Sequence, residues 1–188
     1  GNGIFESHLI SGLGYYHSNG IDLGDLNNDG NIDIAFSLKY YDAHSKIVML
    51  MNSGNATFSP NPSNTIYTSG YSSEPKLADF NGDHCLDISS ESYHYFNNCS
   101  AVFSSTLFNE GSEAFPFDMD GDGDMDLAYT TASSGGPDNL GKFLQNDGTG
   151  TFRDTFTISL YQWTHSATTA DFDNDGDIDI AISNLKGP

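Results

Sequence analysis

The sequence predicts an all-β protein built from four repeats of about 47 residues. Three observations support this fold class. An acidic segment of nine residues occurs four times, each copy leads directly into apolar residues with a period of two, and no stretch of ten or more residues has helical periodicity. The four segments are residues 25–33, 79–87, 118–126 and 171–179.

A strand is expected at the end of each acidic segment. Residues 32–36 alternate apolar side chains with Asp33 and Ala35, and residues 86–88, 125–129 and 178–182 follow the same alternation. An EF-hand is excluded, because its loop needs flanking helices and a glutamate at the twelfth position. The residues at that position are Phe36, Ser90, Tyr129 and Ile182.

A second motif recurs between the acidic segments. Residues 52–58 and 146–152 share the pattern Asn-x-Gly-x-x-Thr-Phe, which is typical of a turn that leads into a strand. Residues 97–103 keep only the Asn and the Phe, and residues 1–5 resemble the end of a further copy. Several short strands joined by such turns give each repeat the size of one propeller blade.

The spacing within the acidic segments suits a hard cation. Each copy has Asp or Asn at its first, third, fifth and ninth positions, and Ca²⁺ prefers such oxygen ligands on a sharply curved loop. The sixth position favours glycine, because the backbone must turn there with positive φ; Gly30, Gly123 and Gly176 provide it, whereas the second copy has His84. At the seventh position only a backbone carbonyl is needed. The residues there are Asn31, Cys85, Asp124 and Asp177.

The charge of the chain is concentrated in these segments. They hold 16 of the 26 acidic residues, and the chain has only six Lys and Arg. Clustered carboxylates repel one another unless a cation lies among them, so up to four Ca²⁺ are expected. A disordered acidic tail is the alternative, and the strand pattern after each segment argues against it. The shortage of basic residues argues against nucleic acid or anionic membranes as partners.

These motifs resemble the FG-GAP and VCBS repeats of integrin α-subunits, a fungal propeller lectin and many secreted microbial proteins. The resemblance covers essentially the whole chain, and it implies one four-stranded propeller blade per repeat, with a calcium loop between two strands of the blade. It also implies the side-chain ligands of each site. They are Asp25, Asn27, Asp29 and Asp33; Asp79, Asn81, Asp83 and Asp87; Asp118, Asp120, Asp122 and Asp126; and Asp171, Asp173, Asp175 and Asp179.

The number of repeats departs from the family pattern. Family propellers usually close with seven blades, and this chain has four loops, in approximate repeats 5–57, 58–102, 103–151 and 152–188 of a single region 1–188. We therefore expect part of a larger propeller or of one completed by another chain. A ring of four blades closed by the N-terminal strand is the alternative.

The cysteines and sequons favour an extracellular setting. Cys85 and Cys99 are expected to form a disulfide across neighbouring strands, with two unpaired buried thiols as the alternative. Asn55 and Asn98 begin glycosylation sequons in predicted turns. The first residues lack the features of a secretory signal, and no stretch approaches 18 apolar residues, so no membrane insertion is expected.

Sequence motifs of catalysis are absent: the chain has no H-E-x-x-H, no G-x-S-x-G and no phosphate-binding loop. Tyr161, Trp163 and His165 form an aromatic group that could contact a sugar or a protein, although packing between blades is the simpler explanation. We expect a non-enzymatic, calcium-stabilised module for adhesion or for glycan or protein binding. The alternatives are a subunit of an extracellular fibre or surface layer, assembled from copies of this chain, and an accessory domain of a secreted polysaccharide-active enzyme.

Overall fold

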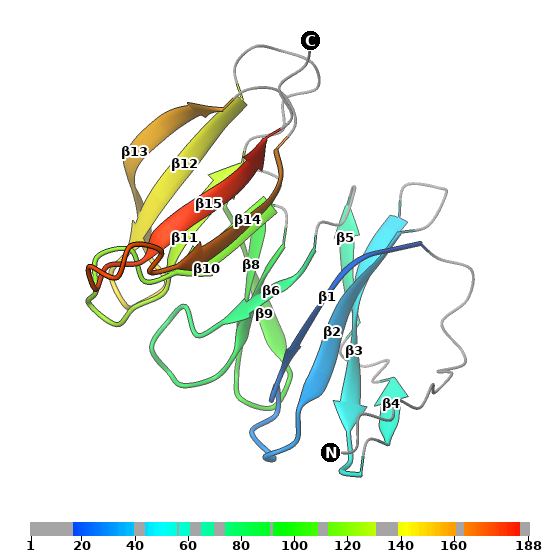
Figure 1. The fold of residues 1–188 in the computed structure, drawn as a ribbon. Helices are drawn as coiled ribbons and strands as arrows, with labels where there is room; N and C mark the ends of the chain where they lie inside the picture. Colours follow the sequence, from blue (N-terminus) through cyan, green and yellow to red (C-terminus); the bar gives the residue numbers. More distant parts are fainter. Residues whose placement is uncertain are drawn as a thin grey trace, which may run out of the picture.

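The computed structural model describes residues 17–39, 44–55, 57–60, 65–69, 74–90, 92–108, 113–130, 139–160 and 164–184. Within these residues every regular element is a β-strand, and the strands form four antiparallel sheets in sequence order (Figure 1). The predicted all-β class is confirmed. No helix among the described residues could span a membrane.

Each sheet is built from strands that are consecutive in the chain. The first sheet contains β1 (His17–Gly24), β2 (Asp33–Lys39), β3 (His44–Asn52), β4 (Phe58–Pro60) and β5 (Ile66–Ser69). The second contains β6 (Lys76–Ala78), β7 (Asp87–Ser90), β8 (Tyr93–Asn97) and β9 (Phe103–Leu107). The third contains β10 (Glu113–Phe117), β11 (Asp126–Thr130), β12 (Asn139–Asn146) and β13 (Phe152–Leu160). The fourth contains β14 (Thr164–Ala170) and β15 (Asp179–Asn184).

The four acidic segments, called the first to fourth loops from here on, close equivalent hairpins. Each joins the first strand of a sheet to the second, and in each the residue before the loop pairs with the ninth residue of the loop. The four pairs are Gly24 with Asp33, Ala78 with Asp87, Phe117 with Asp126, and Ala170 with Asp179. Each sheet therefore begins one strand before its loop. The bounds of the sheets differ from those of the sequence repeats 5–57, 58–102, 103–151 and 152–188, each of which begins at a Phe.

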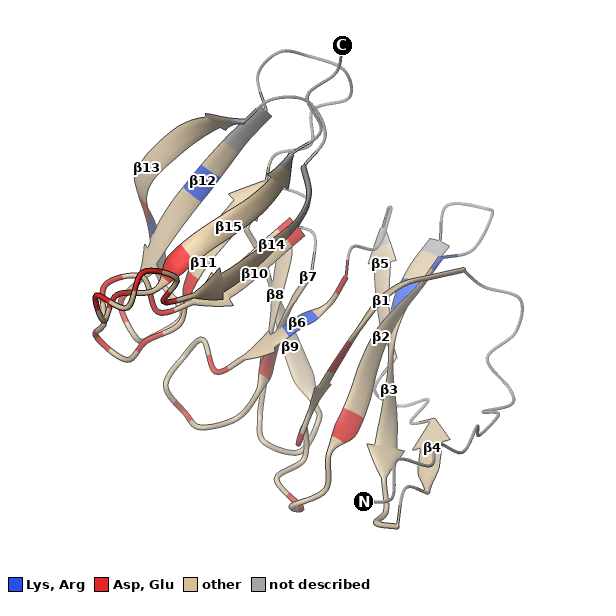
Figure 2. Ribbon diagram, in the orientation of Figure 1, with Lys and Arg blue, Asp and Glu red and all other residues tan. Residues whose placement is uncertain are grey.

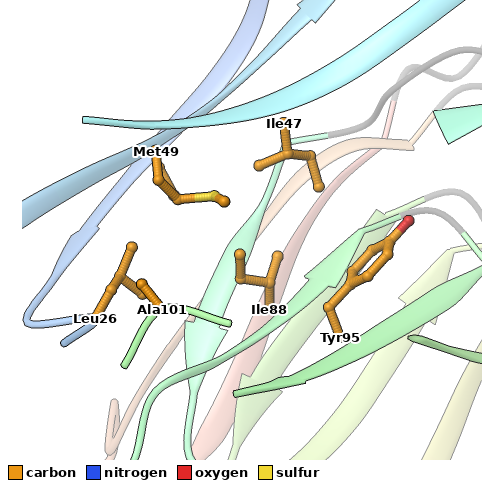
Figure 3. Packing of buried hydrophobic residues seen from close by; sticks show 7 residues of the cluster. Leu26, Ile47, Met49, Ile88, Tyr95 and Ala101 are labelled. Atoms are coloured by element: carbon orange, nitrogen blue, oxygen red, sulfur yellow. The ribbon is translucent and has the colours of Figure 1, made fainter. Parts of the chain in front are cut away.

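The apolar core lies between neighbouring sheets. Leu26, the second residue of the first loop, packs with Ile47 and Met49 of the first sheet and with Ile88 and Tyr95 of the second (Figure 3). This contact joins two consecutive sheets through one loop side chain. Stacking of each unit on the next is the architecture expected of blade-like repeats.

The second and third loops place an apolar residue at the same position. Phe80 is fully buried with Leu127, Tyr129 and Leu144 of the third sheet. In the third loop, Met119 packs against a buried cluster of the third sheet, and Ala167 of β14 and Ile180 of β15 pack against the same cluster. The equivalent Phe172 of the fourth loop is 54% exposed. The second loop position therefore packs against the following sheet in the first two loops, and in the third loop it belongs to a cluster that the following sheet also contacts.

A polar network is buried between the second and third sheets. His94 of β8 lies 3.2 Å, through Nε2, from the hydroxyl of Tyr129, which in turn lies 3.3 Å from Oγ of Ser89. The imidazole stacks on Phe152 with 5.1 Å between ring centroids, and it meets Phe108 edge-on. Burial lowers the pKa of His94 to about 4, because the charged ring would lose its hydration.

Candidate metal centre

The four loops lie at hairpin ends, where the acidic residues of the molecule gather. Figure 2 shows this most clearly at the loops that join β10 to β11 and β14 to β15. The backbone turns at the sixth position with positive φ, at Gly30 (86°), Gly123 (95°) and Gly176 (99°). His84 adopts the same conformation, with φ of 67°. The second loop thus has the same turn as the others, despite its side chain.

The first aspartate of each loop lies inside this turn. Its Oδ2 accepts a hydrogen bond from the backbone N–H of the sixth residue, so the loop curls around the carboxylate. The donors and acceptors, with their N···O distances, are Gly30 and Asp25 (2.7 Å), His84 and Asp79 (2.7 Å), Gly123 and Asp118 (3.0 Å), and Gly176 and Asp171 (3.1 Å).

The third and fifth side chains are oriented by the loop backbone as well. An oxygen of the third residue accepts the N–H of the fifth, as Asn81 does from Asp83 at 3.0 Å and Asp173 from Asp175 at 3.2 Å. Oδ1 of the fifth residue accepts the N–H of the seventh in all four loops, at 2.8 to 2.9 Å. These bonds orient the third and fifth side chains, and at the fifth position the bond from the backbone goes to Oδ1 rather than to Oδ2.

The resulting oxygens converge in two of the loops. One carboxylate oxygen from each of Asp118, Asp120 and Asp122 lies within 4.8 Å of the other two. The same holds for Asp171, Asp173 and Asp179. Donor sets made only of carboxylate and amide oxygens suit Ca²⁺, whereas structural zinc sites use mainly sulfur and nitrogen. The residues present therefore fit a hard divalent cation.

The ninth aspartate has a second role that its spacing did not reveal. Asp33, Asp87 and Asp126 are fully buried. Asp87 accepts the N–H of Phe80 at 3.1 Å through Oδ2 and the N–H of Asn97 at 2.7 Å through Oδ1. Asp33 and Asp126 accept the equivalent pairs of bonds. Each of these carboxylates therefore joins the start of its loop to the turn that follows the third strand of the sheet.

Burial of these carboxylates is opposed by the loss of hydration. Desolvation raises the pKa of Asp87 to about 6, although its two backbone hydrogen bonds act in the other direction. It also raises the pKa of Asp33 and of Asp126. A cation among the loop oxygens would favour the ionised form, because it supplies the opposite charge.

Asparagines of the turns, which the sequence prediction did not treat as functional, connect the loops to neighbouring sheets. Nδ2 of Asn97 donates to the carbonyl of Leu26 in the first loop at 2.8 Å. Nδ2 of Asn146 donates in the same way to Phe80 in the second loop, also at 2.8 Å. The apolar residue at the second position of all four loops was the sequence feature that could have indicated this interface.

The two cysteines form the predicted disulfide. Cys85 is at the seventh position of the second loop, as predicted, and Cys99 lies in the turn between β8 and β9, so the bond joins a loop to a turn and does not cross two strands as expected. The bond joins the loop to the same turn that Asp87 contacts through Asn97. A covalent bond therefore supports this loop, which is the one without a glycine at its sixth position.

The remaining predicted residues lie outside the loops. The sequon residues Asn55 and Asn98 are both exposed in turns. Tyr161 and Trp163 lie outside the described residues. His165 belongs to β14, and its side chain is outside the part that the structure describes.

The sequence matches a family model of the FG-GAP-like repeat over residues 25–89 and 109–182, which is well over half of the chain. The first match begins at the first loop and extends into β7, and the second includes the third and fourth loops. A search of curated proteins gave no match. The predicted resemblance is confirmed: the chain belongs to the family of FG-GAP-like repeat proteins, and its sheets form a β-propeller-like module.

Proposed function

We propose that this chain is an extracellular calcium-binding module of the β-propeller type, in which up to four structural Ca²⁺ ions support a surface for adhesion to a glycan or a protein. The observation that carries the proposal is the repeated hydrogen-bond pattern of the loops. In all four loops the backbone N–H of the sixth residue donates to the first aspartate, and the N–H of the seventh residue donates to the aspartate at the fifth position. The loop with His84 has the same two bonds.

A structural role for the metal follows from where the carboxylates lie. Two carboxylates about 4 Å apart repel by about 4 kcal/mol at an effective dielectric constant of 20, and the third loop contains five aspartates. Asp126 of that loop is buried and holds the turn that starts at Asn146. An ion in the loop would offset the repulsion, and this stabilisation would reach the sheet through Asp126.

The extracellular setting is supported by the disulfide and by the type of site. Disulfides persist in oxidising compartments. Calcium sites of extracellular modules bind with Kd of about 10⁻⁴ to 10⁻³ M, a range in which they are filled outside cells and not in the cytosol. The bond between Cys85 and Cys99 next to the second loop is consistent with both arguments.

A binding role without catalysis is part of the proposal. The clustered aspartates are better explained as metal ligands than as catalytic acids, because a bound cation would oppose the raised pKa that a general acid requires. His94 is enclosed by aromatic rings and the Tyr129 hydroxyl. The abundant acidic residues favour partners that are neutral or basic.

Calcium-dependent stability tests this function. Thermal unfolding should shift upward in ~2 mM Ca²⁺ relative to EDTA, with about 2 kcal/mol per site if Kd is about 10⁻⁴ M. Calorimetric titration should give a stoichiometry that falls by one ion in the Asp122→Ala variant. The control is Asp154→Ala, which removes an exposed carboxylate of β13 outside the loops. Identical unfolding in calcium and EDTA would refute the proposal.

A further inference from the structure

A cavity of about 530 Å³ lies between the second and third sheets, beside the second and third loops. Its larger apolar lining residues are Leu77, Leu86, Pro116 and Met125. Its polar lining includes His84 of the second loop and Asp124 of the third. We call it the loop cavity. Its volume is within the range of pockets that bind small ligands or single side chains.

His84 has no evident role in the loop itself. The sixth position contributes its backbone N–H to Asp79, which any residue can do. The other three loops have glycine there, and a non-glycine residue with φ of 67° carries a strain of about 1 kcal/mol. The His84 side chain is 96% exposed, with Nδ1 3.7 Å from Asp79. Because His84 also lines the loop cavity, its imidazole is accessible to a ligand there.

Asp124 is likewise not needed as a side-chain ligand. It occupies the seventh position, where the loop requires only a backbone carbonyl and where Asn and Cys occur in the first two loops. Its N–H donates to Asp122 at 2.9 Å, so the loop geometry does not use its carboxylate. Asp124 is half-buried and lines the cavity, and its carboxylate lies beside Gly148. Its negative charge is therefore available to a ligand in the loop cavity.

The negative charge of the two loops around the cavity favours a cationic ligand. The third loop has five aspartates, and the second has Asp79, Asp83 and Asp87. One divalent ion in each loop would leave three negative charges on the third loop and one on the second. The loop cavity thus stays in a negative environment when both metals are bound, and an anionic ligand would be repelled.

We propose that the loop cavity binds a lysine side chain of a protein partner. The alkyl stem lies against Leu77, Leu86, Pro116 and Met125, and the ammonium group lies beside Asp124 and His84. Apart from His84, the side chains that line the cavity are not aromatic, and an aliphatic floor fits the flexible stem of lysine better than the planar guanidinium of arginine, which prefers stacking and bidentate pairing. This inference rests on the proposed function, because the loops that form the walls are the proposed calcium sites.

The test uses the 188-residue chain and three capped pentapeptides, with Lys, Arg or norleucine at the centre of a glycine sequence. Binding is measured by NMR titration in ~2 mM Ca²⁺ at low salt, where charge contacts are least screened. We expect the Lys peptide to bind at least ten-fold more tightly than the norleucine peptide. Equal affinities for these two peptides, or equal or tighter binding of the Arg peptide, would overturn the assignment.

Two variants locate the site. Asp124→Asn should weaken Lys-peptide binding at least ten-fold, whereas the control Asp154→Asn, which removes a charge away from the cavity, should leave it unchanged. His84→Gly restores the residue of the other loops, so it should keep or raise the melting temperature while weakening the peptide several-fold. Equal effects of Asp124→Asn and Asp154→Asn would show that binding reflects only the overall charge and would overturn the proposal.

Calcium-dependent melting is recorded on the same samples, so that the two proposals can fail separately. If calcium raises the melting temperature and the Lys peptide does not bind, the loop cavity is not a lysine site and the calcium function stands. If calcium has no effect on melting, the proposed function fails irrespective of the peptide. Binding that is strong in calcium and lost in EDTA supports both.

Discussion

The role of the second loop position can be tested with one substitution made at two equivalent places. Phe80 and Phe172 are the same residue at the same position of the second and fourth loops. Phe80 is fully buried against the third sheet, with its ring centroid 5.4 Å from that of His94 and 6.0 Å from that of Phe152. Phe172 is 54% exposed. Replacement of each by alanine therefore compares burial alone.

Phe80→Ala should lower the free energy of unfolding by about 4 kcal/mol, because it removes a buried ring and leaves a cavity between two sheets. Phe172→Ala in the same 188-residue chain should cost less than about 0.5 kcal/mol, as expected for an exposed site. For a chain of this length, 1 kcal/mol corresponds to about 2–4 °C in melting temperature. The difference should therefore exceed ~7 °C.

The measurement is urea and thermal unfolding of both variants in saturating calcium, followed by circular dichroism. Both substitutions keep the backbone N–H that donates to the ninth aspartate, Asp87 or Asp179, so calcium titration of each variant should match the unaltered chain. Losses of stability within 1 kcal/mol of each other would refute the idea that this position anchors a sheet to the following one.

Three further perturbations address the contacts around the loops. Asn146→Ala should cost about 1–3 kcal/mol, because the carbonyls of Phe80 and Met125 lose their donor; chemical denaturation that shows no change would contradict this. Because burial lowers the pKa of His94 from 6.5 to about 4, its neutral form stabilises the fold fully above pH 6.5. That contribution, about 3 kcal/mol, should be lost as the pH falls toward 4, and in pH-resolved melting curves His94→Gln should lose less stability than the unaltered chain over this range, because the carboxylates titrate in both. Replacing Cys85 and Cys99 together with serine should cost about 3 kcal/mol and act like reduction of the unaltered chain in unfolding assays.

Local spacing was sufficient to predict the loops and the strand that follows each of them. Apolar residues alternate with other residues around the ninth aspartate of each loop, and this pattern identified the strand that follows, because the side chains of a strand alternate between two faces. The four aspartates are Asp33, Asp87, Asp126 and Asp179. The positive φ of the sixth residue also followed from the sequence, since glycine occupies it in three loops. These features depend on residues close together in the chain, so a single sequence contains the information.

The contacts between sheets could not be predicted in this way. Burial of Phe80 and exposure of Phe172 depend on what packs against each loop, and the two residues have identical local patterns. The same holds for the bond from Asn97 to Leu26, whose partners are 71 residues apart.

The sequence by itself determined that oxygen donors recur on tight turns that lead into strands, because ligand spacing and strand periodicity are local properties of the chain. Only the tertiary structure decided that the ninth aspartate holds a neighbouring turn and that His84 and Asp124 border one cavity. The physical reason is that burial and proximity arise from the stacking of whole sheets, which brings together residues that no local pattern relates.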